Sequence, residues 1–260
     1  MEITLSNCVI VTLGAIAVSI GGMFVVRKNV SLENLRSHHD VTDPLLAVLG
    51  TLFAILLGFM LANAMQRFEE ARSNIQQEAG CVGDLYRLAS GLPSQAKEKT
   101  QQDCLSYLNL VIGEEFPLMQ KGQLSPQAWN VYGDLWHDCI AYEPQTQREN
   151  NIDQYLIAAM SKTGECRRAR AAQLNYSLPP TLWFVLLFGG ISTIAFTYFF
   201  AVDNVRLQIL MTSVITMIIC LNTYMLAGYD APFSGDIAIT PVAFETVRDN
   251  LQKVQTKQQH

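Results

Sequence analysis

Four long apolar runs, arranged as two pairs, constrain this chain more than any other feature. The first pair is Cys8 to Val26 and Pro44 to Met65, and the second pair is Pro180 to Val202 and Val205 to Tyr229. A helix that rises about 1.5 Å per residue needs about 20 apolar residues to cross a hydrocarbon core about 30 Å thick. The runs have that length, so we predict an all-α integral membrane protein with four transmembrane helices.

The first run resembles a signal peptide in length but not in its flanks. The start of the chain, MEITLSN, contains no basic residue, and Arg27 and Lys28 follow the run. A signal peptide has its positive charges before the apolar segment. We therefore expect the first run to be a retained transmembrane helix.

A polar insert separates the two pairs and is predicted to be helical. Span two continues outward as a helix, with apolar residues at the three- and four-residue steps of a helical face. Further helices are expected over about Gln95 to Glu115, from Ser125-Pro126 onward, and from about Gln145 to Gln173, which together form a small bundle stacked on the membrane domain. The predicted organisation is residues 1–66 (spans one and two), 67–179 (helical insert), 180–229 (hairpin of spans three and four) and 230–260 (a turn and an amphipathic helix).

Charge and motifs argue against a nucleic-acid-binding protein and against an enzyme. The formal net charge is −5, whereas phosphate binding needs clustered Lys and Arg. The basic cluster Arg167, Arg168 and Arg170 precedes an apolar run and is interpreted as a membrane-flanking anchor. No phosphate-binding glycine loop, nucleophile elbow or HExxH motif is present, so we expect no catalytic residues and no cofactor.

The residue types that could bind a metal or act as an acid–base pair are poorly placed for either role. The six cysteines show no zinc-ligand spacing, and His38-His39-Asp40 is expected to be a solvated loop, so no metal site is predicted. The adjacent pairs Glu69-Glu70 and Glu114-Glu115 point to different helix faces and are expected to be solvated.

The basic residues next to the spans set the expected orientation. Five of them lie near the ends of the insert and four lie in the loops on the opposite face. The positive-inside rule counts such residues, and the narrow majority places the insert and both termini in the cytoplasm.

Span two carries the pattern that is most informative about function. One face has small residues four apart, Gly50, Ala54, Gly58 and Ala62, a spacing that lets helix backbones approach closely in lipid. On roughly the opposite side of the helix, apolar residues are followed by polar and then acidic residues. The residues on this side are Leu52, Ile55 or Leu56, Phe59, Asn63, Gln66, Glu70, Ser73 and Gln77. This series has two interpretations. Its residues line a water-filled pathway, or Asn63 and Gln66 simply mark the membrane interface, where polar residues belong.

Polar residues of span four form a second line. Thr212, Thr216, Cys220 and Thr223 share one side of the helix. Interhelical hydrogen bonding is the favoured interpretation of this line. The Gly189-Gly190 pair of span three is interpreted as a close-packing or flexible point.

Two segments resemble a known family of membrane proteins. They are FEEARSNIQQEAG (Phe68 to Gly80) and APFSGDIAITPVAF (Ala231 to Phe244), and the two-span, insert, two-span layout agrees over nearly the whole chain. The chain resembles the bestrophin-like domain family of bacteria and plants. That resemblance implies a multi-pass protein of a bacterial plasma (inner) membrane and a likeness to bestrophins, which are pentameric ion channels whose second helix lines the pore.

The resemblance assigns candidate roles to residues of span two. Ile55 and Phe59 would form the constriction of a homo-oligomeric channel, and Asn63, Gln66 and Glu70 its wider polar mouth. A ring of Glu70 side chains favours cations, whereas the bestrophin likeness implies chloride or bicarbonate. Span two lacks the apolar-Pro-Phe motif of the bestrophin pore neck, with no proline after Pro44. The expected partners are further copies of the chain, inorganic ions and lipid; the alternative function is a non-conducting scaffold or sensor whose helical bundle binds a partner.

Overall fold

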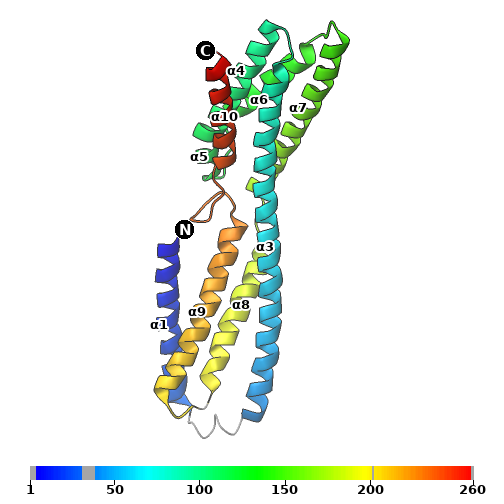
Figure 1. Cartoon of the computed structure of the whole chain (residues 1–260). Coiled ribbons are helices and arrows are strands. Elements are labelled where there is room, and N and C mark those ends of the chain that lie inside the picture. The colour runs from blue at the N-terminus through cyan, green and yellow to red at the C-terminus, as the bar shows by residue number, and fades with distance from the viewer. Residues whose placement is uncertain (1–3, 31–38, 201, 259–260) are drawn as a thin grey trace. The chain divides into compact units, whose positions relative to one another are not determined.

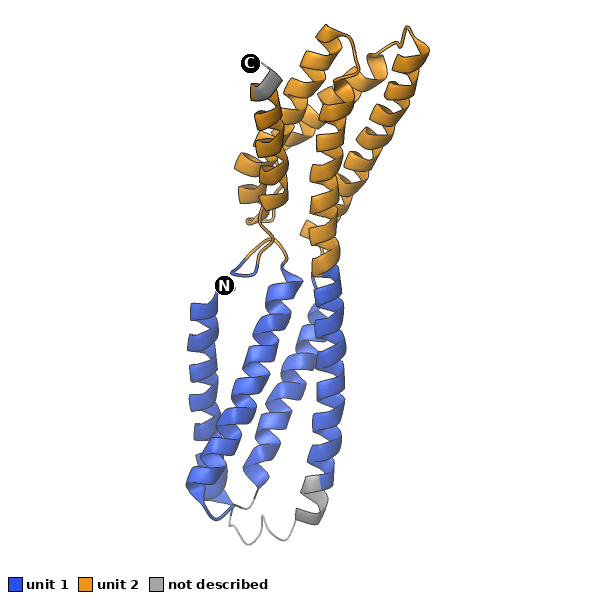
Figure 2. Cartoon of the chain, in the orientation of Figure 1, with its two compact units in different colours: residues 1–67, 177–231, 235–237 blue, residues 68–176, 232–234, 238–260 orange. Residues whose placement is uncertain are grey.

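The computed structural model describes residues 4–30, 39–200 and 202–258, and these residues contain helices and no strands. Four of the described helices are long and apolar enough to cross a membrane. The predicted all-α membrane fold, with a helical region between spans two and three, is confirmed. The chain divides into two compact units, shown in different colours in Figure 2.

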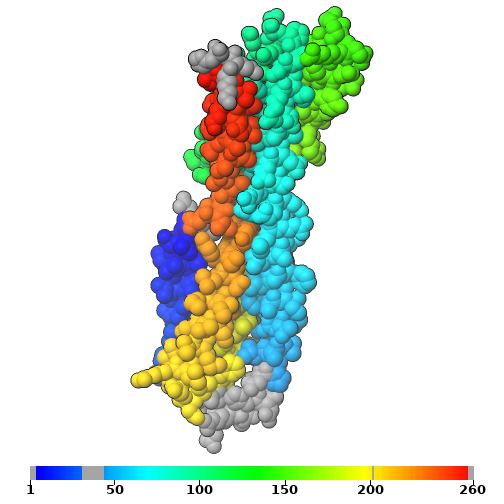
Figure 3. Space-filling model, viewed as in Figure 1, coloured from blue at the N-terminus to red at the C-terminus, as the bar shows by residue number. Residues whose placement is uncertain are grey.

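Unit 1 contains residues 1–67, 177–231 and 235–237 and holds the apolar spans. Its helices are α1 (Leu5–Asn29), the first part of α3 (His39–Ala89), α8 (Pro180–Phe196) with the short 3₁₀ turn η2 (Thr197–Phe199), and α9 (Val205–Asp230) (Figure 1). Helix α1 packs along α9, as the space-filling view also shows (Figure 3). Helices α3, α8 and α9 share a small buried cluster that includes Phe53, Leu57, Leu186 and Leu226.

Hydroxyl groups connect the spans of unit 1, as the polar line of span four predicted. The Thr216 hydroxyl donates a hydrogen bond to the Ser19 hydroxyl of α1 at 3.2 Å. Thr212 lies 3.2 Å from the Thr197 hydroxyl of η2. Buried hydroxyls in an apolar surrounding need such partners. The interpretation of this line as interhelical hydrogen bonding is therefore confirmed for Thr212 and Thr216.

Unit 2 contains residues 68–176, 232–234 and 238–260. After the second part of α3 come α4 (Ser94–Leu110), the π-helical turn η1 (Val111–Glu115), α5 (Phe116–Met119), α6 (Pro126–Ala141) and α7 (Gln147–Leu174), and α10 (Val242–Gln258) ends the described chain. Ser125 caps α6 by accepting a hydrogen bond from the Ala128 N–H at 3.1 Å, and Thr146 caps α7 in the same way through Glu149. These starts agree with the sequence expectation to within about two residues.

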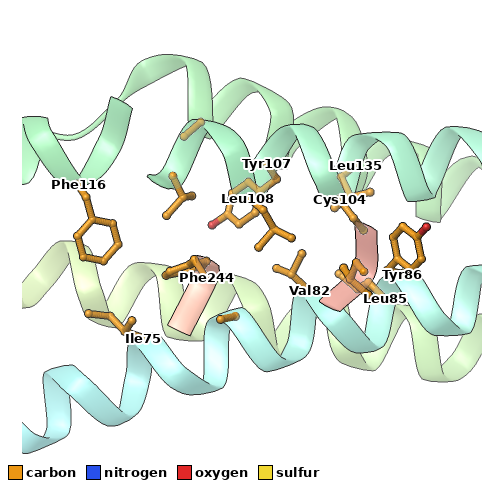
Figure 4. Close-up of a cluster of buried hydrophobic side chains, with 14 of the residues drawn as sticks. Ile75, Val82, Leu85, Tyr86, Cys104, Tyr107, Leu108, Phe116, Leu135 and Phe244 are labelled. Carbon is orange, nitrogen blue, oxygen red and sulfur yellow. The ribbon is translucent and has the colours of Figure 1, made fainter. Parts of the chain in front are cut away.

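The core of unit 2 forms where the apolar stripe of α3 meets α4 and α10. Ile75, Val82 and Leu85 of α3 point toward Leu108 of α4 and Phe244 of α10 (Figure 4). All five side chains are almost completely buried. The three- and four-residue spacing of these α3 residues was the signal that predicted a helix continuing beyond the span.

The largest difference in secondary structure lies in the second predicted insert helix. We expected one helix to about Glu115, but α4 ends at Leu110 and is followed by the π-helical turn η1. A π-helical turn is an irregularity that apolar periodicity does not reveal. At the start of span two, α3 begins at His39, so Pro44 lies inside the helix and not in its first turn. The side chains of the His38-His39-Asp40 cluster lie outside the described residues.

Close packing of α8 on α3 gives a first testable prediction. A Cβ atom added at Gly189 would lie 2.8 Å from Cδ2 of Phe53, so Gly189→Ala forces the ring to move. We expect this substitution to destabilise unit 1 by about 1–3 kcal/mol, the range for overpacked cores. SDS-induced unfolding of the purified protein in mixed micelles measures the change.

Gly21→Ala is the matched control, because no described atom lies within 4 Å of a Cβ at Gly21 on helix α1. This control variant should be as stable as the parent or slightly more stable, since alanine favours helix. Equal stability of the parent and Gly189→Ala would contradict a tight α3–α8 contact.

Candidate functional site

Helix α3 presents one buried and one exposed stripe within unit 1. The buried stripe consists of Phe53, Leu57, Met60 and Ala64, which contact α8, α9 or the segment before α8. Successive residues of an α-helix are rotated by about 100°, so residues near Phe59 point away from this stripe. The described part of the chain therefore leaves one long face of α3 uncovered.

All five predicted pore residues lie on the uncovered face. Ile55 is 52% exposed and Phe59 is 74% exposed. Asn63 and Gln66 follow on the same side and are exposed, as is Glu70 in the part of α3 that belongs to unit 2. The helix thus brings an apolar segment and a polar segment into one line. The roles of these residues in a pore remain a prediction.

Most of the small-residue stripe is left exposed by the described residues. Ala54, Gly58 and Ala62 are exposed, and no described atom lies within 4 Å of a Cβ placed at Gly50 or Gly58. A four-residue step rotates by about 40° beyond a full turn, so the stripe drifts around the helix and reaches the half-buried Gly50. A helix-packing role for the stripe therefore stays a prediction about contacts between copies.

An ion pair that sequence reasoning missed joins three helices of unit 1. The Arg67 guanidinium of α3 lies 3.3 Å from the carboxylate of Asp230, the last residue of α9. Asp230 also accepts hydrogen bonds from the Leu178 N–H at 3.0 Å, just before α8. One carboxylate thus fixes the ends of the α3, α8 and α9 bundle. The sequence signal was weak, since Arg67 resembled an ordinary interfacial charge.

Unit 2 contains a fully buried network of two arginines and two glutamates. Arg170 of α7 makes two hydrogen bonds of 2.8 Å to Glu78 of α3 and a third of 2.8 Å to Glu115 at the end of η1. Arg167 donates to Glu115 at 2.8 Å and to the Tyr107 hydroxyl at 2.7 Å, and Tyr107 in turn donates to Glu78. Each charged side chain is at most 1% exposed. The two positive and two negative charges balance.

Aromatic rings complete the surroundings of the two arginines. The Arg167 guanidinium carbon lies 4.5 Å from the centre of the Trp129 ring, and that of Arg170 lies 5.8 Å from the Phe244 ring. A cation over an aromatic face is attracted by the ring quadrupole, more strongly when water is excluded. The network therefore connects α3, η1 and α7 through charge and packs against α6 and α10 through rings.

Two sequence interpretations are wrong at this network. Arg167 and Arg170 are not a membrane-flanking anchor, because both side chains are buried in unit 2, while Arg168 is exposed. Glu115 is not solvated, although Glu69 and Glu70 are exposed as expected. A usable signal existed: Glu78 follows the apolar positions Ala71 and Ile75, and Glu115 follows Tyr107 and Val111, at helical steps. A charge at a core position of one helix requires an opposite charge on another.

The electrostatics of the network favour a structural clamp over acid–base chemistry. Burial, followed by the Glu78 charge, raises the pKa of Tyr107 well above its ordinary value, so the phenol stays protonated. Burial alone would lower the pKa of Arg170, but the charge and hydrogen bond of Glu78, together with Tyr107 and Glu115, outweigh it and raise that pKa. Neither group titrates near neutral pH. Among the described residues no cluster of His, Cys, Asp and Glu side chains could hold a metal ion.

Removing one arginine of the network should be strongly destabilising. In Arg170→Met, Glu78 and Glu115 remain buried with a single arginine, and breaking a buried pair in this way costs about 3–5 kcal/mol. We expect loss of the folded protein at a lower denaturant concentration or temperature, measured by circular dichroism. The exposed neighbour gives the control, since Arg168→Met should change stability by less than about 1 kcal/mol.

A charge-balanced double variant separates electrostatics from packing. Arg170→Met with Glu78→Met removes one charge of each sign and leaves the Arg167–Glu115 pair. Replacing both members of a buried pair with apolar groups is often close to neutral. The double variant should therefore be more stable than Arg170→Met alone; a double variant that is less stable would contradict the charge-clamp account.

Comparison with known proteins agrees with this architecture. A crystal structure of a point variant of a bacterial bestrophin homologue from Klebsiella pneumoniae matches with a TM-score of 0.72 at 12% identity, covering 93% of this chain and 99% of that chain. A second crystal structure of a homologue from that organism matches with a TM-score of 0.68 at 13% identity, covering 93% and 97%. A crystal structure described as a membrane protein variant matches with a TM-score of 0.67 at 16% identity, covering 96% and 98%. At these identities the matches show a shared fold.

The sequence itself gives the family. No curated protein matches the chain. The model of the bestrophin-like domain matches residues 13–244, which is most of the chain and includes spans two to four and the greater part of span one. This protein is a multi-pass membrane protein that belongs to the bestrophin-like domain family.

Proposed function

We propose that this chain is one subunit of a homo-oligomeric ion channel whose pore is lined by α3. One observation carries the proposal: Asn63 lies one turn after the exposed Phe59, on a face of α3 that the other described helices leave exposed. Polar side chains at membrane depth face a protein interior or water, because hydrocarbon cannot solvate them. Copies of the chain around a common axis would supply both a protein surrounding and water.

The small-residue stripe supports this arrangement. Ala54, Gly58 and Ala62 are exposed on α3; Ala54 and Gly58 lie between the buried stripe and the Phe59 line, and Ala62 lies next to that line. Small residues at this spacing allow close approach of a second helix in lipid. A neighbouring copy can therefore pack on this side while the Phe59 line faces the axis. A pentamer is the assembly that the bestrophin likeness suggests.

The order of residues along α3 gives each part of the proposed pore a role. Ile55 and Phe59 form the apolar constriction, and hydrophobic constrictions close channels by excluding water. Asn63, Gln66 and Glu70 form the wider mouth. Repeating Glu70 around an axis produces a ring of carboxylates, which attracts cations and repels anions. The proposed ion is therefore an inorganic cation.

Shortening the constriction residue tests the first role. Phe59→Ala removes the most exposed large apolar side chain of the α3 line and should raise single-channel conductance severalfold, or open channels that are otherwise closed. Planar-bilayer recordings of the purified protein measure this effect. Phe184→Ala is the control, because Phe184 is 70% exposed on α8, outside the proposed pore. Equal effects of the two variants would contradict a constriction at Phe59.

Charge reversal at the mouth tests the second role. Glu70→Lys should shift the reversal potential in a salt gradient toward the anion equilibrium potential, because a ring of lysines replaces a ring of carboxylates. Glu69→Lys makes the same charge change one residue, or about 100°, away on the helix and should shift it much less. An unchanged reversal potential in Glu70→Lys would contradict a ring of Glu70 carboxylates in the pore. Absence of current from the assembled protein would favour a non-conducting scaffold.

A further inference from the structure

A second polar cluster in unit 2 lies apart from the arginine–glutamate network. Helices α4, α6 and α7 line a half-open cavity of about 350 Å³. Its lining includes Lys99 and Thr100 from α4, Asp138 and Cys139 from α6, and Asp153 from α7. Most other buried residues of unit 2 belong to an apolar core, so this concentration of carboxylates needs an explanation.

The carboxylates at and next to the cavity are incompletely paired. Lys99 lies 2.6 Å from Oδ2 of Asp138, and the Lys99 side chain is 61% exposed. Asp103 is not part of the cavity lining and follows Lys99 by one turn on the same side of α4. Oδ2 of Asp103 and Oδ1 of Asp153 are buried and have no hydrogen-bond partner in the described part of the chain. A buried ionised oxygen without a partner is costly, and a proton on the carboxyl group removes much of this cost.

The charges that act on Asp103 come from α6 and from its own helix: Asp138 and Asp134 on α6 are negative, and Lys99 on α4 is positive. Asp153 on α7 does not act on Asp103 directly, but both carboxylates act on Cys139. Burial first, and then the Asp138 charge, raises the pKa of Asp103 above its ordinary value. Burial also raises the pKa of Asp153. The Cys139 thiol between them has its pKa raised to about 11 by burial and these carboxylates, so it stays neutral.

We propose that the α4–α6 contact next to this cavity is a proton-responsive joint, in which a proton bound at Asp103 allows a carboxyl–carboxylate hydrogen bond to Asp138 and tightens the packing of α4 on α6. Two ionised carboxylates can only accept hydrogen bonds, so they repel each other; one proton converts them into a donor and an acceptor. Asp153, on the third helix, adds a second acid with a buried unpaired oxygen. The joint is a property of unit 2 and does not depend on the proposed channel function.

The direction of the pH effect follows from linkage. A carboxyl whose pKa is higher in the packed state binds protons more tightly there than in the opened state. The packed state is therefore favoured as the pH falls through the pKa of the packed state, and this stabilisation is lost as the pH rises above it. Each unit of difference between the two pKa values changes the opening equilibrium by about tenfold.

Hydrogen exchange of the full-length protein in nanodiscs measures this opening directly. After correction for the intrinsic pH dependence of exchange, amides of α4 and α6 should be better protected at about pH 4, near the ordinary pKa of an aspartate, than at about pH 8. Asp103→Asn resembles the protonated acid and should show a much smaller pH difference, with protection near the acid level of the parent. Asp103→Asn combined with Asp153→Asn should abolish the difference.

Glu98→Gln is the matched control, since Glu98 is exposed on the same helix, and this variant should behave as the parent does. Infrared difference spectra of the parent give a readout that does not depend on how the variants fold: acidification should produce the C=O band of a protonated carboxylic acid. That band should be missing in Asp103→Asn. An equal pH difference in parent and Asp103→Asn, or a parent without any pH difference in α4 and α6, would overturn the proposal.

Discussion

Hydrocarbon cannot hydrogen-bond, and the account of this protein depends on that constraint. Helix α3 buries Phe53, Leu57 and Met60 against its own unit and leaves the line through Phe59 and Asn63 uncovered. An uncovered apolar residue can face lipid, but Asn63 on the same face requires protein or water. Asn63 has no hydrogen-bond partner among the described residues, and the proposed assembly around an axis would provide both protein and water.

A second constraint acts in unit 2, where charges are taken out of water. Glu78 and Glu115 are buried only because Arg167 and Arg170 reach them from α7, and the four charges cancel. Such pairs add little stability compared with apolar packing, but they penalise any arrangement that separates the partners. We infer that the network fixes the register of α7 against α3. The part of α3 that carries Glu70 belongs to the same unit, so its helix is held by this clamp.

The sequence predicted the helices better than it predicted which side chains contact each other across helices. The long apolar runs predicted the spans, and the apolar stripe through Ile75 and Val82 predicted that α3 extends beyond its span. Both signals can be read from one segment, because the buried face of a helix repeats every three to four residues. The buried network depends on which side chains meet across helices, which no single segment displays. Arg170 was therefore interpreted from its neighbour in sequence, an apolar span, although its neighbour in space is Glu78. The π-helical turn η1 was missed because apolar periodicity does not reveal such an irregularity.

The most direct test of the central claim is the symmetry of the assembled protein. Single-particle images of the protein in nanodiscs should show a closed ring of four or more copies, with Phe59 and Asn63 of α3 facing a hydrated axis. A monomer, or a dimer without a central axis, would contradict the account, as would a ring in which Asn63 is buried between helices away from water.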